Sequence, residues 1–347
     1  MNLLIASFDP PTAPCGRLRI LDPFAALGGH TIRYAMQPHE GGFAFRMDQL
    51  AWADVVVTQR GFPQPNTRAL LEPILASGKP VVYETDDCLP EVPDYLGKPH
   101  YREWGPDVLS WASRVDAVTV ATPALAEYFA PHARRVFVLP NYLASRTRPP
   151  HLRTVPNGEG RIGIGFAGNA GHRGDLAPVA QALRRIQERR AEVRVTFFGG
   201  VPDGFAAGER VRVIPPDWRY DLFPGRLAQL GLDIGIAPLV DNAFNRCVSN
   251  LKYLEYGALG IAGVFSRVRA FESVHDGETG LLCDSTSASW EEAIERLCAD
   301  AGLRRRIGEA ARADVRAHWM LEPHAHLWAE AYSEIVETKA ASPQGRP

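Results

Sequence analysis

The sequence predicts an α/β fold made of two Rossmann-like domains that face a common cleft. Short apolar runs rich in valine and isoleucine alternate with amphipathic helical patterns, which is typical of a parallel sheet whose strands are joined by helices. This alternation stops in a stretch rich in Pro and Arg between residues 142 and 160, and then it starts again. The 347 residues also exceed the length of one ordinary domain.

The first half of the chain alternates apolar runs with helical patterns. The apolar runs predict strands at residues 2–7, 54–59, 80–85, 117–122 and 135–141. The helical patterns between them cover residues 19–29, 67–78 and 123–133. Gly28 and Gly78 end the first two of these helices, because glycine readily takes the left-handed conformation that closes a helix.

The second half repeats the pattern after the predicted linker. Strands are expected at residues 161–168, 193–200, 211–216, 232–239, 262–266 and 280–284. Helices are expected at residues 174–190, 249–259 and 287–300, followed by two more helical segments that end near Glu337. A capping box formed by Ser289 and Glu292 opens the third helix. We expect domains at 1–157 and 158–320, then a C-terminal helix and a disordered tail at 321–347.

Composition excludes several classes of protein. The formal net charge of −2 gives no basic field that would attract nucleic acid. No apolar run approaches the roughly 20 residues of a membrane span, and the N-terminus lacks the basic region of a signal peptide. The five cysteines are scattered without a C-x-x-C motif, which argues against a zinc site or a disulfide framework. A reducing cytoplasm is therefore the expected location.

The stretch "CVSNLKYLEYGALG", residues 247–260, carries polar groups at the start of a predicted helix. Ser249 is expected to cap this helix. The free N–H groups and positive dipole end of its first turn suit a phosphate, and Lys252 would add a positive charge. Glu255 lies three residues further on the same face, where its two oxygens suit a sugar diol. The alternative is an ordinary capped helix with an exposed Lys–Glu pair.

The longer segment "DIGIAPLVDNAFNRCVSNLKYLEYGALGIAGVFS", with the later "GETGLL", resembles the donor-site segment of GT-B glycosyltransferases. The resemblance is to the retaining group 1 family, also called family 4, and it extends more weakly over nearly the whole chain. It implies two Rossmann-like domains that face a cleft, with C-terminal helices that pack back toward the N-terminal domain. It also implies that Glu255 holds the donor ribose and that the amides of Ser249, Asn250 and Leu251 hold the pyrophosphate.

The segment departs from the family pattern at two positions. Cys247 stands where the family has the first glutamate of an E-x₇-E pair, and Ala262 stands where it has proline. We considered Asp241 and Asn245 as substitutes for the missing carboxylate, and we expect Asn245 on the donor side.

A second glycine-rich stretch, "GFAGNAGHRGDL", covers residues 165–176. Its G-x-G-x-x-G match falls inside a predicted strand instead of the following turn, which disfavours a dinucleotide-binding dehydrogenase. The resemblance makes Arg173 the counterpart of a lysine that clamps the diphosphate, and it puts Asn169 at the place of the family's arginine. We expect Gly171 and His172 beside the donor. The alternative for Arg173 is a surface residue next to a polar turn.

Two further groups precede the linker. Asp86 and Asp87 follow a strand in "YETDDCLPEVPD" and would bind acceptor hydroxyls, bind a metal as in a GT-A transferase, or serve as structural caps. Gly16 and Arg17 follow the first strand and are expected at the cleft, where the family has a glycine-containing loop. His100 is a further candidate cleft residue, although a solvent-exposed loop histidine is the alternative.

These observations predict a glycosyltransferase that moves a sugar from a nucleoside-diphosphate donor to an acceptor on the N-terminal domain. Arg173 and Lys252 would stabilise the leaving diphosphate. The resemblance implies retention of configuration and no metal, and we expect no cofactor. The acceptor is left open between a saccharide, a lipid-linked compound and a small molecule, and so is peripheral membrane contact. The alternatives are a catalytically silent GT-B binding protein and a nucleotide-sugar 2-epimerase.

Overall fold

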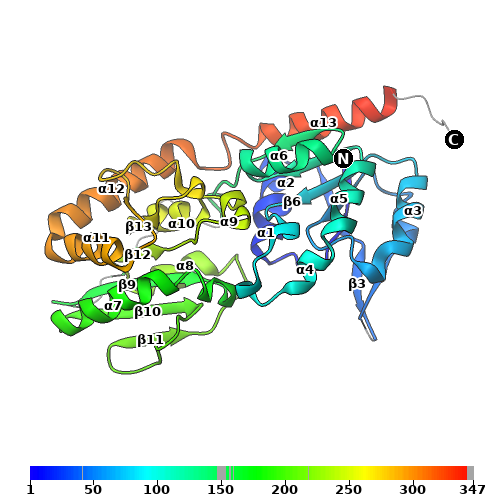
Figure 1. The fold of residues 1–347 in the computed structure, drawn as a ribbon. Helices are drawn as coiled ribbons and strands as arrows, with labels where there is room; N and C mark the ends of the chain where they lie inside the picture. Colours follow the sequence, from blue (N-terminus) through cyan, green and yellow to red (C-terminus); the bar gives the residue numbers. More distant parts are fainter. Residues whose placement is uncertain (41, 147–153, 156–157, 159, 218, 342–347) are drawn as a thin grey trace.

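The computed structural model of the chain describes residues 1–347 except 41, 147–153, 156–157, 159, 218 and 342–347. Most of the predicted linker and of the predicted disordered tail lies outside these described residues. Two α/β domains make up the molecule, and Figure 1 shows the N-terminal one in blue to teal and the other in green to orange.

The N-terminal domain is built around a six-stranded parallel sheet in the order β2-β1-β5-β6-β7-β8. The strands are β1 Asn2–Ala6, β2 Thr31–Tyr34, β5 Val55–Gln59, β6 Val81–Thr85, β7 Ala117–Val120 and β8 Val136–Val138. In the register of the sheet, Leu4 pairs with Val56 and Val82 pairs with Ala117. The central strands β5, β6 and β7 are buried along their whole length, as continuous apolar runs predict for a covered parallel sheet.

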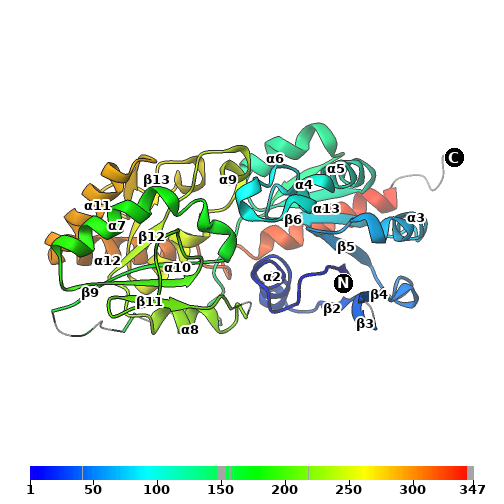
Figure 2. The ribbon, with the colours of Figure 1, turned by 60° about the horizontal axis from the view of Figure 1, so that its bottom comes forward.

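Helices cover both faces of this sheet (Figures 1 and 2). They are α1 Pro14–Gly16, α2 Asp22–Leu27, α3 Arg68–Ala76, α4 Pro99–Glu103, α5 Gly105–Arg114 and α6 Pro123–Phe129. A π-helical turn, Arg17–Leu21, joins α1 to α2. The small antiparallel hairpin of β3 Met36–His39 and β4 Gly42–Phe45 projects from this domain.

The C-terminal domain repeats the architecture with the strand order β11-β10-β9-β12-β13-β14. Its strands are β9 Ile162–Gly168, β10 Val193–Gly199, β11 Val211–Ile214, β12 Ile234–Ala237, β13 Ala262–Ser266 and β14 Leu281–Cys283. Its helices are α7 Ala177–Arg189, α8 Phe223–Ala228, α9 Ala243–Cys247, α10 Leu251–Leu259, α11 Ser287–Ala299 and α12 Ala301–His318. All five pairings in this sheet are parallel, so its carboxyl edge gathers the loops that precede α7 and α10.

The last helix, α13 His326–Ala341, returns to the N-terminal domain (Figures 1 and 2). Its buried side chains, among them Trp328 and Tyr332, pack with Leu3, Ile5 and Phe24 in one core cluster. Where the chain returns to the N-terminal domain, the backbone amide of Leu143 donates to the carbonyl of Trp319 at 2.9 Å. The expected return of the C-terminal helices is thus confirmed.

The sequence missed several elements and misplaced one cap. Strand β2 and the hairpin are short and half exposed, so they lack the apolar runs of the central strands. Helix α11 begins at Ser287 under a cap from Thr286, whose hydroxyl accepts from the amide of Ser289. The capping box assigned to Ser289 and Glu292 is therefore wrong by one turn. Among the described residues, no helix is long and apolar enough to cross a membrane.

Candidate active site

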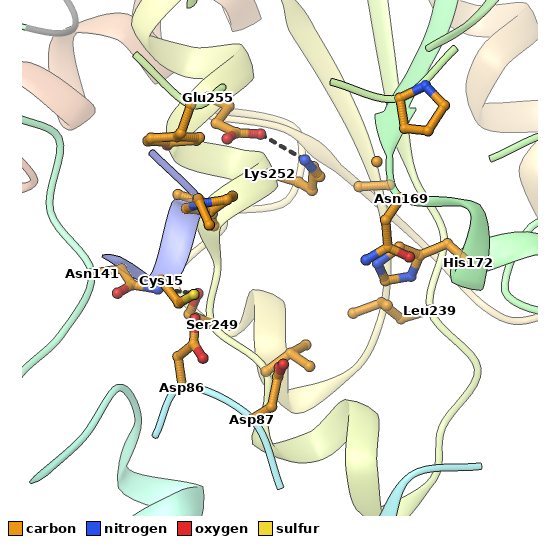
Figure 3. Close-up of a pocket in the computed structure, with 18 of the residues that line it drawn as sticks. Cys15, Asp86, Asp87, Asn141, Asn169, His172, Leu239, Ser249, Lys252 and Glu255 are labelled. Atoms are coloured by element: carbon orange, nitrogen blue, oxygen red, sulfur yellow. Dashed lines mark hydrogen bonds and ion pairs between the residues drawn. The ribbon is translucent and has the colours of Figure 1, made fainter. Parts of the chain in front are cut away.

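A cavity of about 300 Å³ lies between the two domains and is lined by both. The C-terminal domain contributes the loops that precede α7 and α10, and the N-terminal domain contributes the loops that follow β1, β5 and β6. These are the carboxyl ends of parallel strands, where such sheets bind ligands. Figure 3 shows Lys252 and Glu255 on one side of this cavity, Asn169 and His172 across from them, and Asp86 and Asp87 below.

Helix α10 presents the first charged pair to the cavity. Its nine residues are followed by Gly260, whose φ of 73° supplies a left-handed stop. The ammonium of Lys252 lies 2.7 Å from the Oε2 atom of Glu255. Lys252 also lies 5.3 Å from the ring centre of Phe223, which is a cation–π distance. The pair is therefore fixed at the cavity wall and is not the exposed pair of the alternative interpretation.

The cap of α10 differs from the prediction. Asn250 occupies the cap position, and neither its side chain nor that of Ser249 makes a capping hydrogen bond to the helix. Asn250 instead donates to the hydroxyl of Ser273 at 2.9 Å, whereas the hydroxyl of Ser249 accepts from Asn141 of the N-terminal domain at 2.9 Å. Because no side chain of these two residues occupies the first-turn amides, the helix start stays open toward the cavity.

The glycine-rich loop after β9 brings His172 and not Arg173 to the cavity. Residues Ala170–Arg173 form a 3₁₀ turn, in which neighbouring side chains point about 120° apart. His172 lines the cavity and its Nδ1 lies 2.9 Å from a carboxylate oxygen of Asp175. The Arg173 side chain is 63% exposed and pairs with Asp203, so the expected diphosphate clamp by Arg173 is not formed in this structure.

The segment before α10 also departs from expectation. Cys247 is buried in the core cluster of the N-terminal domain, so the position of the missing glutamate does not open into the cavity. Asp241 is exposed and paired with Arg246 at 2.7 Å. Asn245 is buried and donates to the hydroxyl of Tyr95 and to Asp175. Neither Asp241 nor Asn245 lines the cavity, and neither replaces the missing carboxylate there.

On the N-terminal wall, one guanidinium holds three carboxylates. Arg60 lies 2.7 Å from Asp86, 2.7 Å from Asp87 and 3.3 Å from Asp9. Arg60 follows β5 with φ at 50°, a conformation that costs a non-glycine residue free energy and that clusters at functional sites. Burial raises the pKa of the Asp87 carboxyl, and the nearby Arg60 guanidinium opposes that shift.

Three other predicted cleft residues do not line the cavity. The backbone at Gly16 is packed against the carbonyls of Pro10 and Pro11, where a Cβ would lie 3.1 Å from each oxygen. Arg17 pairs with Asp22 at 2.8 Å. His100 packs its ring against those of Tyr101 and Trp104. Gly16 is therefore needed for close backbone packing, and Arg17 for a local ion pair.

Seven of the predicted residues share the cavity, and seven do not. Those that line it are Ser249, Leu251, Lys252, Glu255, His172, Asp86 and Asp87. Those outside its lining are Arg173, Asn250, Gly171, Asn245, Gly16, Arg17 and His100. A side chain at Gly171 would collide with Leu96, because that loop packs directly on the N-terminal domain.

Sequence reasoning missed Arg60, Asn141 and an aromatic wall. Phe223 stacks on Phe198 and on Tyr220 at the C-terminal side of the cavity, with ring centres 5.6 Å and 5.8 Å apart. Arg60 directly follows one predicted strand and Asn141 is the last residue of another, at the edge where ligands bind. That position was the available signal. The aromatic wall had none, because α8 has too few residues for a clear helical period.

Comparison with known proteins agrees with this architecture. Residues 161–300 match the family model described as "Glycosyl transferases group 1". The sequence comparison with curated proteins gives no match. Among solved structures, the chain is similar to a sucrose-phosphate synthase from Thermosynechococcus elongatus, with a TM-score of 0.62, 13% identity, and coverage of 97% of this chain and 100% of that one.

Two more similar structures cover almost the whole chain. A glycosyltransferase from Rickettsia africae has a TM-score of 0.66 and 14% identity, with coverage of 97% of this chain and 98% of that one. The Anabaena protein HepE, in complex with UDP-glucose, has a TM-score of 0.66 and 15% identity, with coverage of 96% and 100%. At these identities the likeness establishes the shared fold. Together with the domain match at residues 161–300, it makes the chain a glycosyltransferase of GT-B fold.

Proposed function

We propose that this glycosyltransferase moves a sugar from a nucleoside-diphosphate donor to an acceptor hydroxyl, with retention of configuration and without a metal ion. The donor lies along the start of α10, and the acceptor lies against the N-terminal wall formed by Asp86 and Asp87. The cytoplasmic location stays a prediction from the cysteine pattern, in keeping with five cysteines that are all described, buried and free.

The pairing of Lys252 with Glu255 inside the cavity carries the proposal. Glu255 offers two acceptor oxygens to a ribose diol, and Lys252 offers a positive charge one turn nearer the open helix start. Amides at a helix start bind phosphate oxygens, and charge on the leaving diphosphate grows in the transition state. His172 lies at the opposite wall and adds a second hydrogen-bond donor.

The structural relatives support a nucleotide donor. The Anabaena protein has been observed with UDP-glucose, with UDP and with UDP plus glucose. The aromatic wall of Phe198, Phe223 and Tyr220 in this chain is suited to the apolar face of a base or sugar. We therefore expect a uridine or other nucleoside diphosphate to bind with its phosphates at Ser249 and Lys252.

The ion pairs that Asp86 and Asp87 make with Arg60 support metal-free chemistry. A divalent ion would need the carboxylates of Asp86 and Asp87, and Arg60 lies 2.7 Å from both. The positive charges for the diphosphate would come from Lys252 and the helix start. Retention is what the resemblance of residues 233–282 implies. Closure of the two domains around the cavity would exclude water from the donor.

A ligand screen followed by turnover measurements tests the function. Thermal shifts are recorded with UDP, GDP, ADP, CDP and dTDP, since a ligand at 100 times its Kd stabilises a protein by about 2.7 kcal/mol. The matching nucleotide sugars are then assayed for hydrolysis and for transfer to a panel of saccharides. We expect release of nucleoside diphosphate, a product of retained configuration by NMR, and turnover that EDTA changes by less than about twofold.

Three outcomes would contradict parts of this proposal. Tight binding without hydrolysis or transfer would favour a silent binding protein. Interconversion of the donor's C2 epimers would favour an epimerase. A tenfold loss with EDTA that Mn²⁺ restores would assign Asp86 and Asp87 to a metal.

A further inference from the structure

The loop that leads into α10 is held by the other domain. Three polar side chains of the N-terminal domain bond to it. The hydroxyl of Tyr95 accepts from Asn242 and Asn245 at 3.0 and 2.9 Å. The hydroxyl of Thr122 donates to the carbonyl of Cys247 at 2.8 Å. Asn141 donates to Ser249 at 2.9 Å. Of these contacts, the one from Asn141 reaches a residue that lines the cavity (Figure 3).

The orientation of the Asn141 amide is fixed from behind by an arginine. The Nη1 atom of Arg19 lies 3.0 Å from the Oδ1 atom of Asn141. Because a guanidinium is donor-only, Oδ1 must accept, and the amide NH₂ group must face Ser249. Asn141 is buried, so water does not compete for either contact. The side chain therefore has one orientation that satisfies both of its neighbours.

Arg19 itself is fully buried and is held through its Nε and Nη1 atoms. Its Nε atom donates to Glu84 at 2.6 Å, and Nη1 also donates to the carbonyl of Leu139. Glu84 in turn accepts from Gln59 at 2.8 Å. The indole of Trp328 in α13 donates to the carbonyl of Arg19 at 3.0 Å. A network of this kind holds Asn141 in place, because moving it would take a hydrogen-bond acceptor from the buried Arg19 guanidinium.

The contact from Asn141 decides how Ser249 can act. The Oγ atom of Ser249 accepts the Asn141 hydrogen, so the hydroxyl hydrogen of Ser249 stays available as a donor. Ser249 lines the cavity two residues before α10, beside Lys252. A hydroxyl that donates there complements an anion, whereas a hydroxyl that points its lone pairs into the cavity would repel one.

We propose that Asn141 is a positioning residue that orients the Ser249 hydroxyl toward the donor phosphate. This rests on the proposed function, in which α10 binds the diphosphate. Because Asn141 and Ser249 belong to different domains, the correct orientation exists only while the domains keep this relative arrangement. Diphosphate binding and domain arrangement are then linked, and each stabilises the other.

A double-mutant cycle with Asn141→Ala and Ser249→Ala tests the proposal. Calorimetry measures the Kd of the nucleoside diphosphate that best stabilises the wild type, and of the matching nucleoside. We expect Asn141→Ala to weaken diphosphate binding by about three- to tenfold, which is what one hydrogen bond supplies. Nucleoside binding stays unchanged. In the Ser249→Ala background, Asn141→Ala has no further effect, because its role runs through the missing hydroxyl.

Tyr95→Phe is the matched control. It removes the interdomain hydrogen bonds of the Tyr95 hydroxyl to Asn242, Asn245 and Asp175 but leaves Ser249 and Asn141 in place. If Asn141 only held the domains together, Tyr95→Phe would weaken diphosphate binding to a similar extent. An equal loss in both variants would therefore overturn the proposal, and so would full additivity of Asn141→Ala with Ser249→Ala.

Asn141→Asp covers the case in which the alanine variant does not fold. It keeps an acceptor for Arg19, but its carboxylate accepts the Ser249 hydrogen and so reverses the contact. The added negative charge repels phosphate whether or not Ser249 is present. The reversed hydrogen bond requires the Ser249 hydroxyl, so the double-mutant cycle separates its effect from that of the charge. We expect a larger loss than for alanine, reduced in the Ser249→Ala background. An equal loss in both backgrounds would overturn the role of Asn141. A wild type that binds no nucleoside diphosphate would instead overturn the proposed function itself.

Discussion

Lys252 and Glu255 form an ion pair of unequal burial, with their charged atoms 2.7 Å apart and side chains that are 23% and 1% exposed. The carboxylate is buried in the cavity wall, whereas the ammonium is partly exposed to the cavity. A buried carboxylate without compensation would cost several kcal/mol, so Lys252 stabilises the site as well as serving a ligand. We therefore expect Glu255 to affect the binding of the ribose and Lys252 the binding of the phosphates.

Glu255→Gln separates these parts. The amide keeps the shape of the side chain but loses the carboxylate that accepts from a diol, and it leaves the Lys252 charge uncompensated on that side. We expect nucleoside diphosphate to bind about tenfold more weakly, on the basis of about 1.4 kcal/mol per decade. Inorganic pyrophosphate should bind as well as to the wild type or better. Calorimetry with both ligands checks this, and an unchanged affinity for the nucleoside diphosphate would remove Glu255 from the ribose site.

Lys252→Ala and Arg173→Ala compare the two cations that the sequence assigned to the leaving group. A charge-assisted hydrogen bond supplies roughly 1.5–3 kcal/mol, so Lys252→Ala should lower kcat/KM by about tenfold to 150-fold. Arg173 pairs with Asp203 and is mostly exposed, so its alanine variant should stay within about twofold. Donor hydrolysis rates measure both. A large loss for Arg173→Ala would restore the family's clamp and contradict the observed direction of its side chain.

The sequence was informative where a repeating pattern is imposed by burial. Strands β5, β6, β9 and β12 were predicted because continuous apolar runs have few other uses in a chain of this composition. The position of Glu255 on α10 was predicted for a similar reason, since a helix places residues three and four apart on one face. The cavity was predicted from the convergence of strand ends in two domains.

The sequence was uninformative where the direction of a side chain depends on the local conformation of the backbone. His172 and Arg173 are adjacent, and a 3₁₀ turn decides which of them faces the cavity. The place of Arg60 after a strand was its only signal, because its role also depends on a positive φ and on contacts with aspartates distant in the sequence. The contact of Asn141 with Ser249 joins residues 108 positions apart, across a domain boundary. Local pattern carries no information on such a contact.

The pH dependence of stability should show the raised pKa of Asp87. In the folded protein this carboxyl holds its proton at pH values where the unfolded chain, with an ordinary pKa of about 3.9, has released it. The contribution of Asp87 to stability therefore falls as pH rises from about 4 through its folded pKa. Asp87→Asn removes this dependence. Denaturant unfolding of both proteins at several pH values, compared pairwise, measures the difference.

Asp241→Asn is the matched control for Asp87, with a shift of opposite sign. Hydrogen bonds from Arg246 lower the pKa of the exposed Asp241 carboxyl. Its contribution to stability is lost only as pH falls below the ordinary range, so its variant should follow the wild type above about pH 4. A variant of Asp87 that also follows the wild type there would show that its carboxyl is solvated and has an ordinary pKa.

The docking of α13 should depend on Trp328 in two separable ways. Trp328 is 1% exposed, and its indole donates to the carbonyl of Arg19 at 3.0 Å. Trp328→Ala leaves a large void and should cost about 3–5 kcal/mol of unfolding free energy. Trp328→Phe keeps most of the buried ring and should cost less, about 1–3 kcal/mol, for the unsatisfied carbonyl and the smaller ring. Equal losses in the two variants would mean that the buried ring contributes nothing beyond the hydrogen bond, whereas an unchanged Trp328→Phe would mean that the hydrogen bond contributes nothing.

The N-terminal wall of the cavity should discriminate between acceptors by charge. Asp9, Asp86 and Asp87 share a single guanidinium, that of Arg60, so negative charge is in excess on this wall. Lys98 also lines the cavity and lies over the ring of Tyr101 at 5.6 Å, so three carboxylates here face two cations. Like charges brought together at a desolvated site cost several kcal/mol. A neutral polyhydroxylated acceptor finds hydrogen-bond acceptors here, whereas a phosphorylated one meets repulsion.

Matched pairs of acceptors measure this discrimination. With the donor held fixed, kcat/KM is determined for a sugar that the wild type accepts and for its 6-phosphate. We expect the phosphorylated acceptor to react at least about tenfold more slowly, a conservative figure for the repulsion. Raising the salt concentration should narrow the ratio, because exposed charges are screened. At a pH above the folded pKa of Asp87, Asp87→Asn should narrow the ratio further by removing one negative charge. Asp241→Asn should leave the ratio unchanged, because Asp241 is not among the lining residues. If the wild type instead prefers the phosphorylated acceptor, then Arg60 must leave its three carboxylates when the acceptor binds, and this wall is an anion site.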